Sequence, residues 1–203
     1  MAEKVLITGV GGFIGSNLAD RLLKEGHAVV GIDNLAYGVR EQVPAGVELY
    51  ERDVRSRDIH PLFRGIDVVF HLAAKNCLAD CQEDPLETAE INIVGTVNVF
   101  EASRKAGVKR VVYAESSVLE EGEARAKGFY AISKAADRMF AEGYQEAFGL
   151  KTVGLRYFNV YGPRQDYRRT MPPIMSKFII TLLKGERPII YEGDDKNKRD
   201  FVY

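Results

Sequence analysis

The chain has 203 residues, of which 46% are hydrophobic and 28% are charged, and its formal net charge is -1. This composition is that of a globular protein able to bury its own core, and it excludes a long basic surface. We therefore expect neither nucleic acid nor a membrane surface as a main partner. The first strand begins close to Met1 and no apolar run is long enough to span a bilayer, so we expect a cytoplasmic protein.

The segment Lys4–Asp33 predicts a strand, a phosphate-binding loop, a helix and a second strand. A short apolar run is followed by Gly9, Gly12 and Gly15, and then by apolar residues at helical spacing. Gly9 permits the tight turn, Gly12 lets backbone amides approach a pyrophosphate, and Gly15 lets the helix pack on the sheet. The diphosphate would lie at the positive end of the helix dipole. A merely structural turn is the alternative, and the flanking elements argue against it.

Asp33 ends the second predicted strand, at the distance from the glycines where a carboxylate binds the hydroxyls of the adenosine ribose. Its charge would repel a 2′-phosphate and no arginine follows until Arg40, so the sequence favours NAD over NADP. Residues 34–38 would wrap the adenosine. Asp53, after a predicted strand at Val47–Tyr50, would either reach the adenine edge or cap the following turn at the surface.

A short helix is expected around Ile59–Phe63, and residues 68–74 then predict a strand buried on both faces in the middle of a parallel sheet. His71 lies within this strand, and we expect a satisfied core histidine rather than a catalyst. The residues after it are better placed for a ligand, because ligands of open α/β sheets bind beyond the carboxyl ends of the strands. Small side chains there, Ala73 and Ala74, leave room for a cofactor.

A long amphipathic helix is predicted from Pro85 to about Ala106, with Gly107 as its stop and Pro85 in its first turn. Apolar residues define its expected buried face: Ile91, Val94, Val97, Val99 and Phe100. Asn92 interrupts this face. It either hydrogen-bonds backbone within the core or points at the cofactor pocket.

Tyr130 and Lys134 stand four residues apart in YAISK and would project from one face of a helix. An adjacent ammonium favours the phenolate of a tyrosine, as would a positive nicotinamide ring, so the phenol can take or return a hydroxyl proton. A helix can carry such a pair by chance. The glycine loop upstream favours chemistry, and so do Ser116 and Ser117, which end a predicted strand over residues 109–117 at the same sheet edge.

The remaining segments predict a strand over residues 151–159, a turn, a helix over Ile174–Lys184 and a short strand over residues 188–193. Strand and helix alternate almost throughout, which predicts an α/β fold with a Rossmann-like, doubly wound parallel sheet. We expect a Rossmann domain over residues 1–160 and the start of an incomplete second part over residues 161–203.

The two cysteines, Cys77 and Cys81, are expected to be free thiols in a reducing compartment. A strained disulfide or half of a metal site is the alternative. The three histidines are scattered, and no metal site is expected.

Taken in order, the motifs TGVGGFIGS, HLAA, NIVGTVN, YAISK, LRYFNVYGPR and GDDKNKRDFVY, together with Asp33, resemble the extended short-chain dehydrogenase/reductase family. Within it, the chain resembles the NAD-dependent nucleotide-sugar epimerases and dehydratases, and most of all the 4-epimerases of UDP-glucose and UDP-N-acetylhexosamines. The resemblance covers the whole chain. It implies tightly bound NAD, a UDP-sugar substrate oxidised at C4, a 4-keto intermediate and return of the hydride to the other face.

The resemblance also implies residue roles. The implied cofactor contacts beyond the glycines are Phe13 and Ile14 at the pyrophosphate, Asp33 and Asn34 at the ribose, Asp53 and Val54 at the adenine, and Leu72, Ala73, Ala74, Lys75, Asn92 and Phe158 along the rest of the dinucleotide. Tyr130 would be the general base, Lys134 would bind the nicotinamide ribose, and Ser116 would hydrogen-bond the 4-hydroxyl. Asn159 would touch the substrate and Arg199 would pair with its diphosphate.

Two departures from the family pattern matter. The segment between the serines and YAISK is shorter, which leaves Ser117 as an alternative to Ser116. Ser117 and Val118 also fill the places where dehydratases and decarboxylases carry an acid, so water elimination is disfavoured. The second departure is that the chain carries only the first pieces of the family's sugar-nucleotide domain, so we expect it to fold and hold NAD but to turn over substrate poorly.

Other readings stay open at this point. The same scaffold serves keto-sugar reductases and decarboxylases, and a non-catalytic NAD-binding fragment is possible in principle. The resemblance further suggests a homodimer packed through the helices that contain Pro85 and Tyr130.

Overall fold

The structure is a computed structural model that describes residues 2–120, 128–166, 171–190 and 200–203. The chain divides into two compact units, Met1–Arg156 and Tyr157–Tyr203, which are described separately. The first unit therefore ends slightly before the boundary predicted at residue 160.

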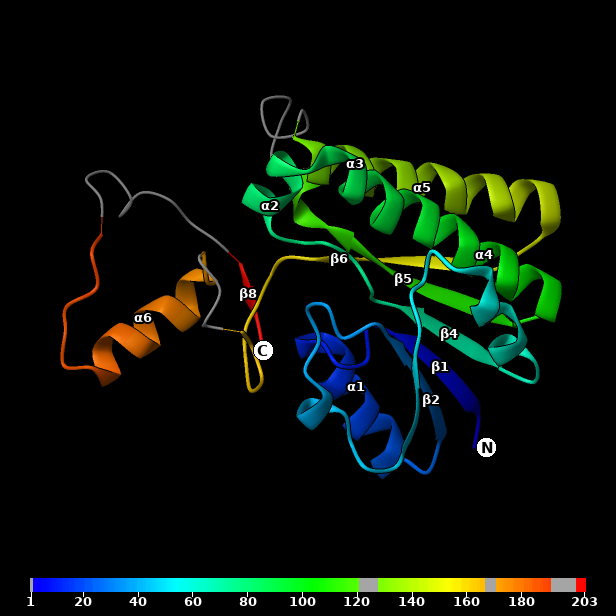
Figure 1. Ribbon diagram of the computed structural model, residues 1–203, viewed down its shortest axis with the longest axis horizontal. Helices are drawn as coiled ribbons and strands as arrows, with labels where there is room; N and C mark the ends of the chain where they lie inside the picture. Colours follow the sequence, from blue (N-terminus) through cyan, green and yellow to red (C-terminus); the bar gives the residue numbers. More distant parts are fainter. Residues whose placement is uncertain (1, 121–127, 167–170, 191–199) are drawn as a thin grey trace. The chain divides into compact units, whose positions relative to one another are not determined.

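A six-stranded sheet forms the centre of the first unit (Figure 1). Its strands are β1 (Lys4–Thr8), β2 (Ala28–Asp33), β3 (Val47–Glu51), β4 (Val68–His71), β5 (Arg110–Ser116) and β6 (Thr152–Tyr157), in the order β3-β2-β1-β4-β5-β6. The pairs β1–β2, β1–β4, β2–β3 and β4–β5 are parallel. The predicted Rossmann-like sheet is confirmed, and its strand order reverses between β1 and β4, where such folds bind their ligands.

Helices cover both faces of this sheet. Helix α1 (Phe13–Lys24) lies on one face, and α4 (Gly95–Ala106) and α5 (Phe129–Phe148) lie on the other (Figure 1). Because successive strand residues point to opposite faces, Val5 and Ile7 pack with Ala19 of α1, whereas Leu6 packs with Val99 and Phe100 of α4. The two hydrophobic cores this creates explain why the strands read as nearly continuous apolar runs.

The helix predicted from Pro85 to Ala106 is interrupted. It consists of α3 (Pro85–Thr88), a π-helical segment η3 (Ala89–Val94) and α4. A π-turn contains an extra residue and so rotates the following side chains away from the register of a regular α-helix. Asn92 is therefore completely buried, while Val94, which was expected on the apolar face, is 52% exposed.

Several short elements connect the main ones. They are the 3₁₀ turns η1 (Arg40–Gln42), η2 (Arg57–Phe63) and η4 (Ser117–Leu119), and helix α2 (Leu78–Glu83). Only η2 was anticipated, as a short helix. Helix α2 falls in a segment for which no element was predicted, because its six residues are too few to display a helical period.

In the second unit, β7 (Asn159–Val160) pairs in parallel with β8 (Phe201–Val202), and helix α6 spans Ile174–Leu183 as expected. The strand predicted over residues 188–193 is wrong for residues 188–190, which are irregular, and its remaining positions lie outside the described residues. Within the described chain, no helix combines the length and the apolar character needed to cross a bilayer.

Gly15 offers a direct test of how closely the glycine loop and α1 pack. A Cβ atom at Gly15 would lie 2.2 Å from the backbone oxygen of Gly9. We expect Gly15→Ala to lower the free energy of unfolding by about 1–3 kcal/mol, the usual cost of overpacking. Gly143, inside α5, has nothing within 4 Å of the same position, so Gly143→Ala should instead stabilise by about 0.5–1 kcal/mol. Urea unfolding measures both, and equal effects would contradict this packing.

Candidate cofactor and catalytic site

The turn from β1 into α1 lies against the segment that follows β4. Gly9 has a φ angle of +74°, a left-handed conformation that side chains rarely adopt. A Cβ atom there would lie 2.8 Å from the backbone nitrogen of Ala73. The Gly9 amide donates to the Ile32 carbonyl at 2.8 Å. A glycine is thus required for the close approach of β1, β2 and β4 at their carboxyl ends.

The start of α1 is suited to an anion. Gly12, at the N-cap, has extended backbone, and no described side chain caps this helix end. The first-turn amides of Phe13 and Ile14 have no acceptor within the helix, and no acidic residue of this turn offsets the positive end of the helix dipole. Their side chains are half-buried. This is an arrangement that binds phosphate groups through backbone amides.

Asp33, the last residue of β2, is buried and held by backbone amides. Its Oδ2 accepts a hydrogen bond from Gly11 N at 2.9 Å, and its Oδ1 accepts one from Leu35 N at 2.8 Å. A Cβ atom at Gly38 would lie only 2.8 Å from Oδ1, so the loop after β2 closes on the carboxylate. Each oxygen keeps further capacity to accept, as a ribose diol would need.

Asp53 adopts the capping role that was one of its two predicted alternatives. Its Oδ1 accepts from the Arg55 amide at 2.8 Å, and its Oδ2 accepts from Arg55 Nη2 at 2.7 Å and from Asn34 Nδ2 at 3.0 Å. The Arg55 guanidinium lowers the pKa of Asp53 to about 2. Asn34 is exposed beside it. Val54 is buried in the core, and its carbonyl accepts from Asn98 Nδ2 at 2.7 Å.

His71 is the satisfied core residue that was expected. It is buried, with Nδ1 2.7 Å from Thr8 Oγ1 and Nε2 2.9 Å from Thr96 Oγ1. The Thr96 hydroxyl donates to the Asn92 carbonyl, so it accepts from Nε2–H, and Thr8 donates to Nδ1. Burial, with a smaller effect of the Lys134 charge, lowers the pKa of His71 to about 3. The imidazole is therefore neutral.

Asn92 hydrogen-bonds backbone within the core, the first of its two predicted alternatives. Its Oδ1 accepts from Lys75 N at 2.8 Å, and its Nδ2 donates to Lys75 O at 3.0 Å and to Ser133 Oγ at 2.9 Å. Ser133 donates in turn to the Tyr130 carbonyl at 2.8 Å. Asn92 thus joins the end of the loop that follows β4 to helix α5.

The β4 loop itself comprises Leu72, Ala73, Ala74 and Lys75. The first three are half-buried, whereas Lys75 is buried and forms an ion pair with Glu87. The loop therefore has small, partly accessible side chains at the sheet edge. The Lys75 ammonium is already occupied by a protein partner.

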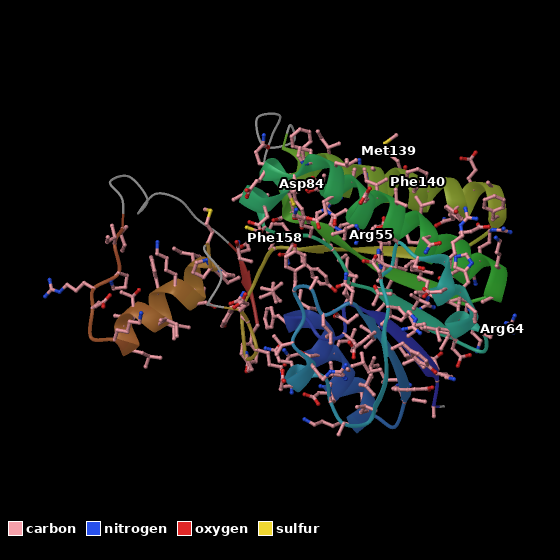
Figure 2. All side chains as sticks on the ribbon, viewed as in Figure 1. Arg55, Arg64, Asp84, Met139, Phe140 and Phe158 are labelled. Carbon is pink, nitrogen blue, oxygen red and sulfur yellow. The ribbon has the colours of Figure 1, made fainter. Side chains whose placement is uncertain are left out.

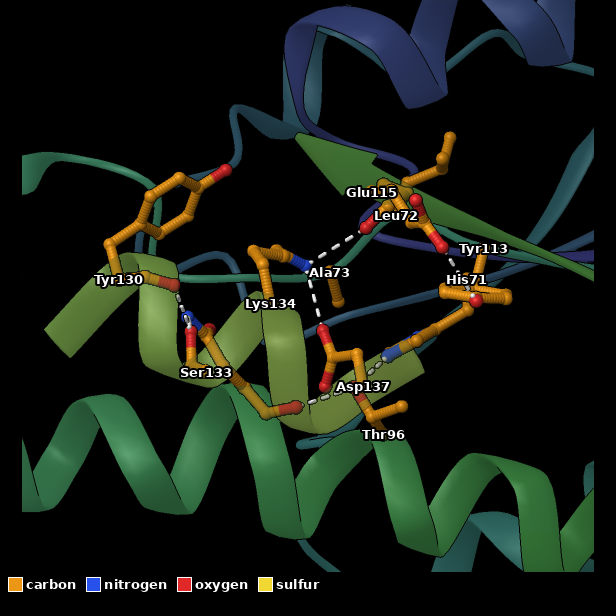
Figure 3. Close-up of polar contacts among 12 residues, drawn as sticks. His71, Leu72, Ala73, Thr96, Tyr113, Glu115, Tyr130, Ser133, Lys134 and Asp137 are labelled. Carbon is orange, nitrogen blue, oxygen red and sulfur yellow. Dashed lines mark hydrogen bonds and ion pairs between the residues drawn. The ribbon is translucent and has the colours of Figure 1, made fainter. Parts of the chain in front are cut away.

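Tyr130 and Lys134 project from the same side of α5 (Figure 3). The Lys134 ammonium is buried and donates to Ala114 O at 3.1 Å and to Asp137 Oδ2 at 3.0 Å. Ala114 stands two residues before Ser116, the last residue of β5, so this contact brings the lysine to the carboxyl end of that strand. Ser116 is half-buried and its Oγ accepts from Val118 N at 3.3 Å.

The buried lysine keeps its charge. Burial alone would lower the pKa of Lys134, but the charge and the hydrogen bond of the Asp137 carboxylate outweigh this effect and raise it. A full positive charge is thus held one helical turn from the Tyr130 side chain.

Four further residues of the predicted site belong to the second unit, to the turn η4 or to the part of the chain outside the described residues. Phe158 and Asn159 belong to the second unit, where Asn159 Nδ2 donates to Asp200 O at 3.0 Å. Arg199 lies outside the described residues. Ser117 starts the turn η4 directly after Ser116. Their roles remain predictions.

Cys77 and Cys81 are free thiols, and Cys81 is buried. Among the residues that the structure describes, no group of three or more His, Cys, Asp or Glu side chains could hold a metal ion.

Sequence reasoning missed three contributors to the site. The Gly11 amide binds Asp33, Ser133 links Asn92 to α5, and Asp137 pairs with Lys134. Only Asp137 carried a usable signal, because residues three apart on a helix share a face. The other two depend on where the glycine loop and the π-helical segment lie in three dimensions.

The strand order and the glycine loop between β1 and α1 define the class of the first unit as a Rossmann-like α/β domain. Residues 5–203 match the model of the NAD dependent epimerase/dehydratase family, and the chain belongs to this family.

Similarities to individual proteins are consistent with this family assignment. UDP-glucose 4-epimerase of Mycolicibacterium smegmatis is 34% identical over 98% of this chain and 69% of its own length. The structure of UDP-N-acetylglucosamine 4-epimerase from Methanobrevibacter ruminantium M1, in complex with UDP-N-acetylmuramic acid, superposes with a TM-score of 0.92 at 32% identity, covering 100% of this chain and 69% of that one. UDP-glucose 4-epimerase of Thermus thermophilus, in complex with NAD, gives a TM-score of 0.86 at 38% identity, covering 98% and 70%.

The environment of His71 predicts that its imidazole does not titrate near neutral pH. The unfolded chain protonates this histidine near its ordinary pKa of 6.5, whereas the folded protein does so only near 3. The unfolded state therefore binds more protons between these values, and the free energy of unfolding should fall by up to about 1.4 kcal/mol per pH unit as the pH drops below 6.5. Nitrogen NMR of the imidazoles should show a neutral Nε2–H ring from pH 5 to 8. A midpoint near 6.5 for His71 would contradict the assignment.

Proposed function

We propose that this chain binds NAD and interconverts the C4 epimers of a UDP-sugar through a 4-keto intermediate. The observation that carries the proposal is the charged, buried Lys134 one turn from Tyr130, held at the carboxyl end of β5. The glycine loop after β1 and the carboxylate of Asp33 after β2 lie on the same sheet edge. A dinucleotide site and an acid–base pair would thus lie along one edge, and oxidation and reduction of a secondary alcohol require both.

The residues present fit NAD. Asp33 would accept the hydroxyls of the adenosine ribose, and the amides of Phe13 and Ile14 would bind the pyrophosphate. The half-buried segment from Leu72 to Ala74 would flank the dinucleotide, and Lys134 would hold the nicotinamide ribose. When bound, NAD supplies the acceptor for the hydride that leaves the sugar carbon and later returns.

Tyr130 would act as the general base. The positive charge of Lys134 stabilises the phenolate, which removes the proton of the sugar 4-hydroxyl as its carbon is oxidised. The Ser116 hydroxyl, whose oxygen accepts from the Val118 amide, is left with its proton to donate to the sugar oxygen. Tyr130 returns the proton when the ketone is reduced, so the cycle consumes neither acid nor base.

Two observations favour epimerisation over elimination or decarboxylation. Val118, after the serines, is buried and apolar, so it cannot move a proton. The nearest acid in this strand, Glu115, is engaged by Tyr113 Oη at 2.9 Å and by Arg156 Nη2 at 2.9 Å. The names of the relatives above support the same reaction. Release of carbon dioxide or net consumption of NADH or NADPH would favour the rival classes.

A homodimer is the oligomer that the surface supports. Apolar side chains on the outer sides of α3 and α5 are exposed: Leu86 at 71%, Ile132 at 47%, Met139 at 68% and Phe140 at 41%. Figure 2 labels Met139 and Phe140 on α5. Exposed apolar side chains in such numbers typically mark a protein interface, and two helices per subunit would form a self-complementary pair.

Asp33 should set the choice of dinucleotide. The first arginine after it, Arg40, forms an ion pair with Glu51, which leaves the Asp33 charge to repel a 2′-phosphate. We expect NAD to bind more tightly than NADP, and Asp33→Ser to reduce the ratio of the two affinities by about tenfold or more. Asp58→Asn, a change at an exposed acid of η2, is the control. Equal affinities of the unaltered chain in titration calorimetry would refute this assignment.

Tyr130→Phe should remove hydride exchange with the sugar while NAD stays bound, because the variant lacks only the proton-transferring oxygen. Losing a general acid–base catalyst costs on the order of a hundredfold or more. Tyr144→Phe, which removes a hydroxyl further along the same helix, should leave the rate unchanged. Single-turnover assays with UDP-glucose and UDP-N-acetylglucosamine measure the effect. A Phe variant that keeps more than about a tenth of the rate would show that Tyr130 is not the base.

Sedimentation velocity tests the proposed dimer. Met139→Glu places a charge in the exposed apolar surface of α5 and should shift the chain toward monomer. Leu183→Glu makes the same change at an exposed leucine of α6, 78% exposed, and should have no such effect. A chain that sediments as a monomer at every concentration would rule the dimer out.

A further inference from the structure

Asp137 is a buried acid that neither the cofactor cradle nor the proton transfer uses. It lies on α5, is 1% exposed, and has one carboxylate oxygen 3.0 Å from Lys134 Nζ. Its other oxygen, Oδ1, is buried and has no hydrogen-bond partner in the described part of the chain. A buried polar atom left in this way costs about 1–3 kcal/mol, so its presence asks for an explanation.

In the described structure, the neighbouring groups give Oδ1 no hydrogen bond and give Lys134 no second counter-charge in contact with it. The Thr96 hydroxyl donates to Asn92 O and accepts from His71 on β4, which is neutral. On β5, the Glu115 carboxylate is bound by Tyr113 and Arg156. Cys81 of α2 is a thiol whose pKa is raised by burial. Asp137 is therefore the counter-charge in direct contact with Lys134 (Figure 3).

We propose that Asp137 is a positioning residue of the catalytic pair: its carboxylate holds Lys134 Nζ against Ala114 O and offsets the lysine charge, which limits the stabilisation of a Tyr130 phenolate. The inference rests on the proposed role of Tyr130. Lys134 needs both contacts, because its ammonium is buried and donates only to Ala114 O and Asp137 Oδ2 within the described structure. An unpaired buried ammonium would be strongly destabilised.

The sign of the effect follows from Coulomb's law. A lone Lys134 charge would pull Tyr130 toward the phenolate, whereas the Asp137 charge repels a second anion nearby. Asp137 therefore offsets part of the effect of Lys134 on Tyr130, so we expect the base to stay protonated to higher pH than Lys134 alone would permit. Replacing Asp137 by an uncharged side chain of similar volume should therefore make Tyr130 ionise at lower pH.

The test is an ultraviolet titration of tyrosinate in the full chain, with and without NAD. The signal of Tyr130 is obtained as the difference between each protein and the same protein with the additional change Tyr130→Phe. We expect Asp137→Asn to move this titration to lower pH by about one unit or more. Glu142→Gln, a change at an acid of the same helix that is exposed to solvent, should leave it in place. Asp137→Thr removes the charge in a second way, should the first variant not fold, and thermal unfolding verifies each protein.

The outcomes separate the inference from the function on which it rests. A Tyr130 titration that is unchanged, or moved to higher pH, in the folded Asp137 variants overturns the role of Asp137. If Tyr130 of the unaltered chain with NAD titrates like an ordinary tyrosine, the proposal that Tyr130 is the base is wrong. The difference in titration between the variants still shows whether Asp137 has the proposed role. Where turnover is measurable, the acidic limb of kcat/KM should move with the Tyr130 titration, which a purely structural role for Asp137 would not produce.

Discussion

The three hydrogen bonds of the Asn92 side chain hold the two halves of the site in register. Oδ1 of this buried amide accepts from Lys75 N, after β4, and Nδ2 donates to Lys75 O and to Ser133 Oγ on the helix that carries Tyr130 and Lys134. Each bond contributes only about 1 kcal/mol net, but losing the amide would leave buried donors and acceptors unpaired at about 1–3 kcal/mol each. The position of α5 relative to the sheet edge therefore depends on Asn92. The π-helical segment is what turns this residue inward.

Around the hydrogen bonds of Asn92, charges of both signs are arranged along one sheet edge. The positive end of α1 and the buried carboxylate of Asp33 stand at the ends of β1 and β2, where a dinucleotide presents its phosphates and its ribose. The charge of Lys134 lies at the end of β5, and Asp137 balances it from the next turn of the helix. His71, between these regions, stays neutral because burial lowers its pKa. The fixed charges of the site therefore lie where a bound dinucleotide and a proton transfer would require charges of opposite sign.

Local patterns in the sequence were enough to predict the sheet, the glycine loop and the place of Asp33, because each follows from neighbouring residues. The apolar run around His71 correctly indicated a central strand and a core histidine. The helix from Pro85 to Ala106 was predicted as regular, since the shift in apolar spacing caused by a single extra residue is too small to recognise in one sequence. Helix α2 was not predicted, and residues 188–190 were wrongly predicted as a strand, for a related reason: short segments take their conformation from tertiary contacts.

Side-chain partners were the least predictable part of the site. Asp53 and Asn92 each had two possible roles in the sequence, and their protein partners in space, Arg55 and Lys75, could not be predicted from it. Their contacts with a dinucleotide remain predictions. Asp137 could have been noticed three residues after Lys134, but its burial and its unpaired oxygen belong to the folded state. The proposed substrate contacts of Asn159 and Arg199 remain predictions.

The central claim is that this sheet edge holds NAD beside a base that acts at C4 of a UDP-sugar. Following the label of UDP-glucose or UDP-N-acetylglucosamine deuterated at C4 tests it most directly, with the NAD-loaded chain quenched at short times and the sugar products analysed by mass spectrometry. The account predicts that the deuterium passes to the cofactor and returns to C4 of the opposite epimer without loss to solvent, and that Tyr130→Phe prevents this transfer. An opposite epimer that carries protium at C4, or neither an opposite epimer nor labelled NADH from either sugar nucleotide, would contradict it.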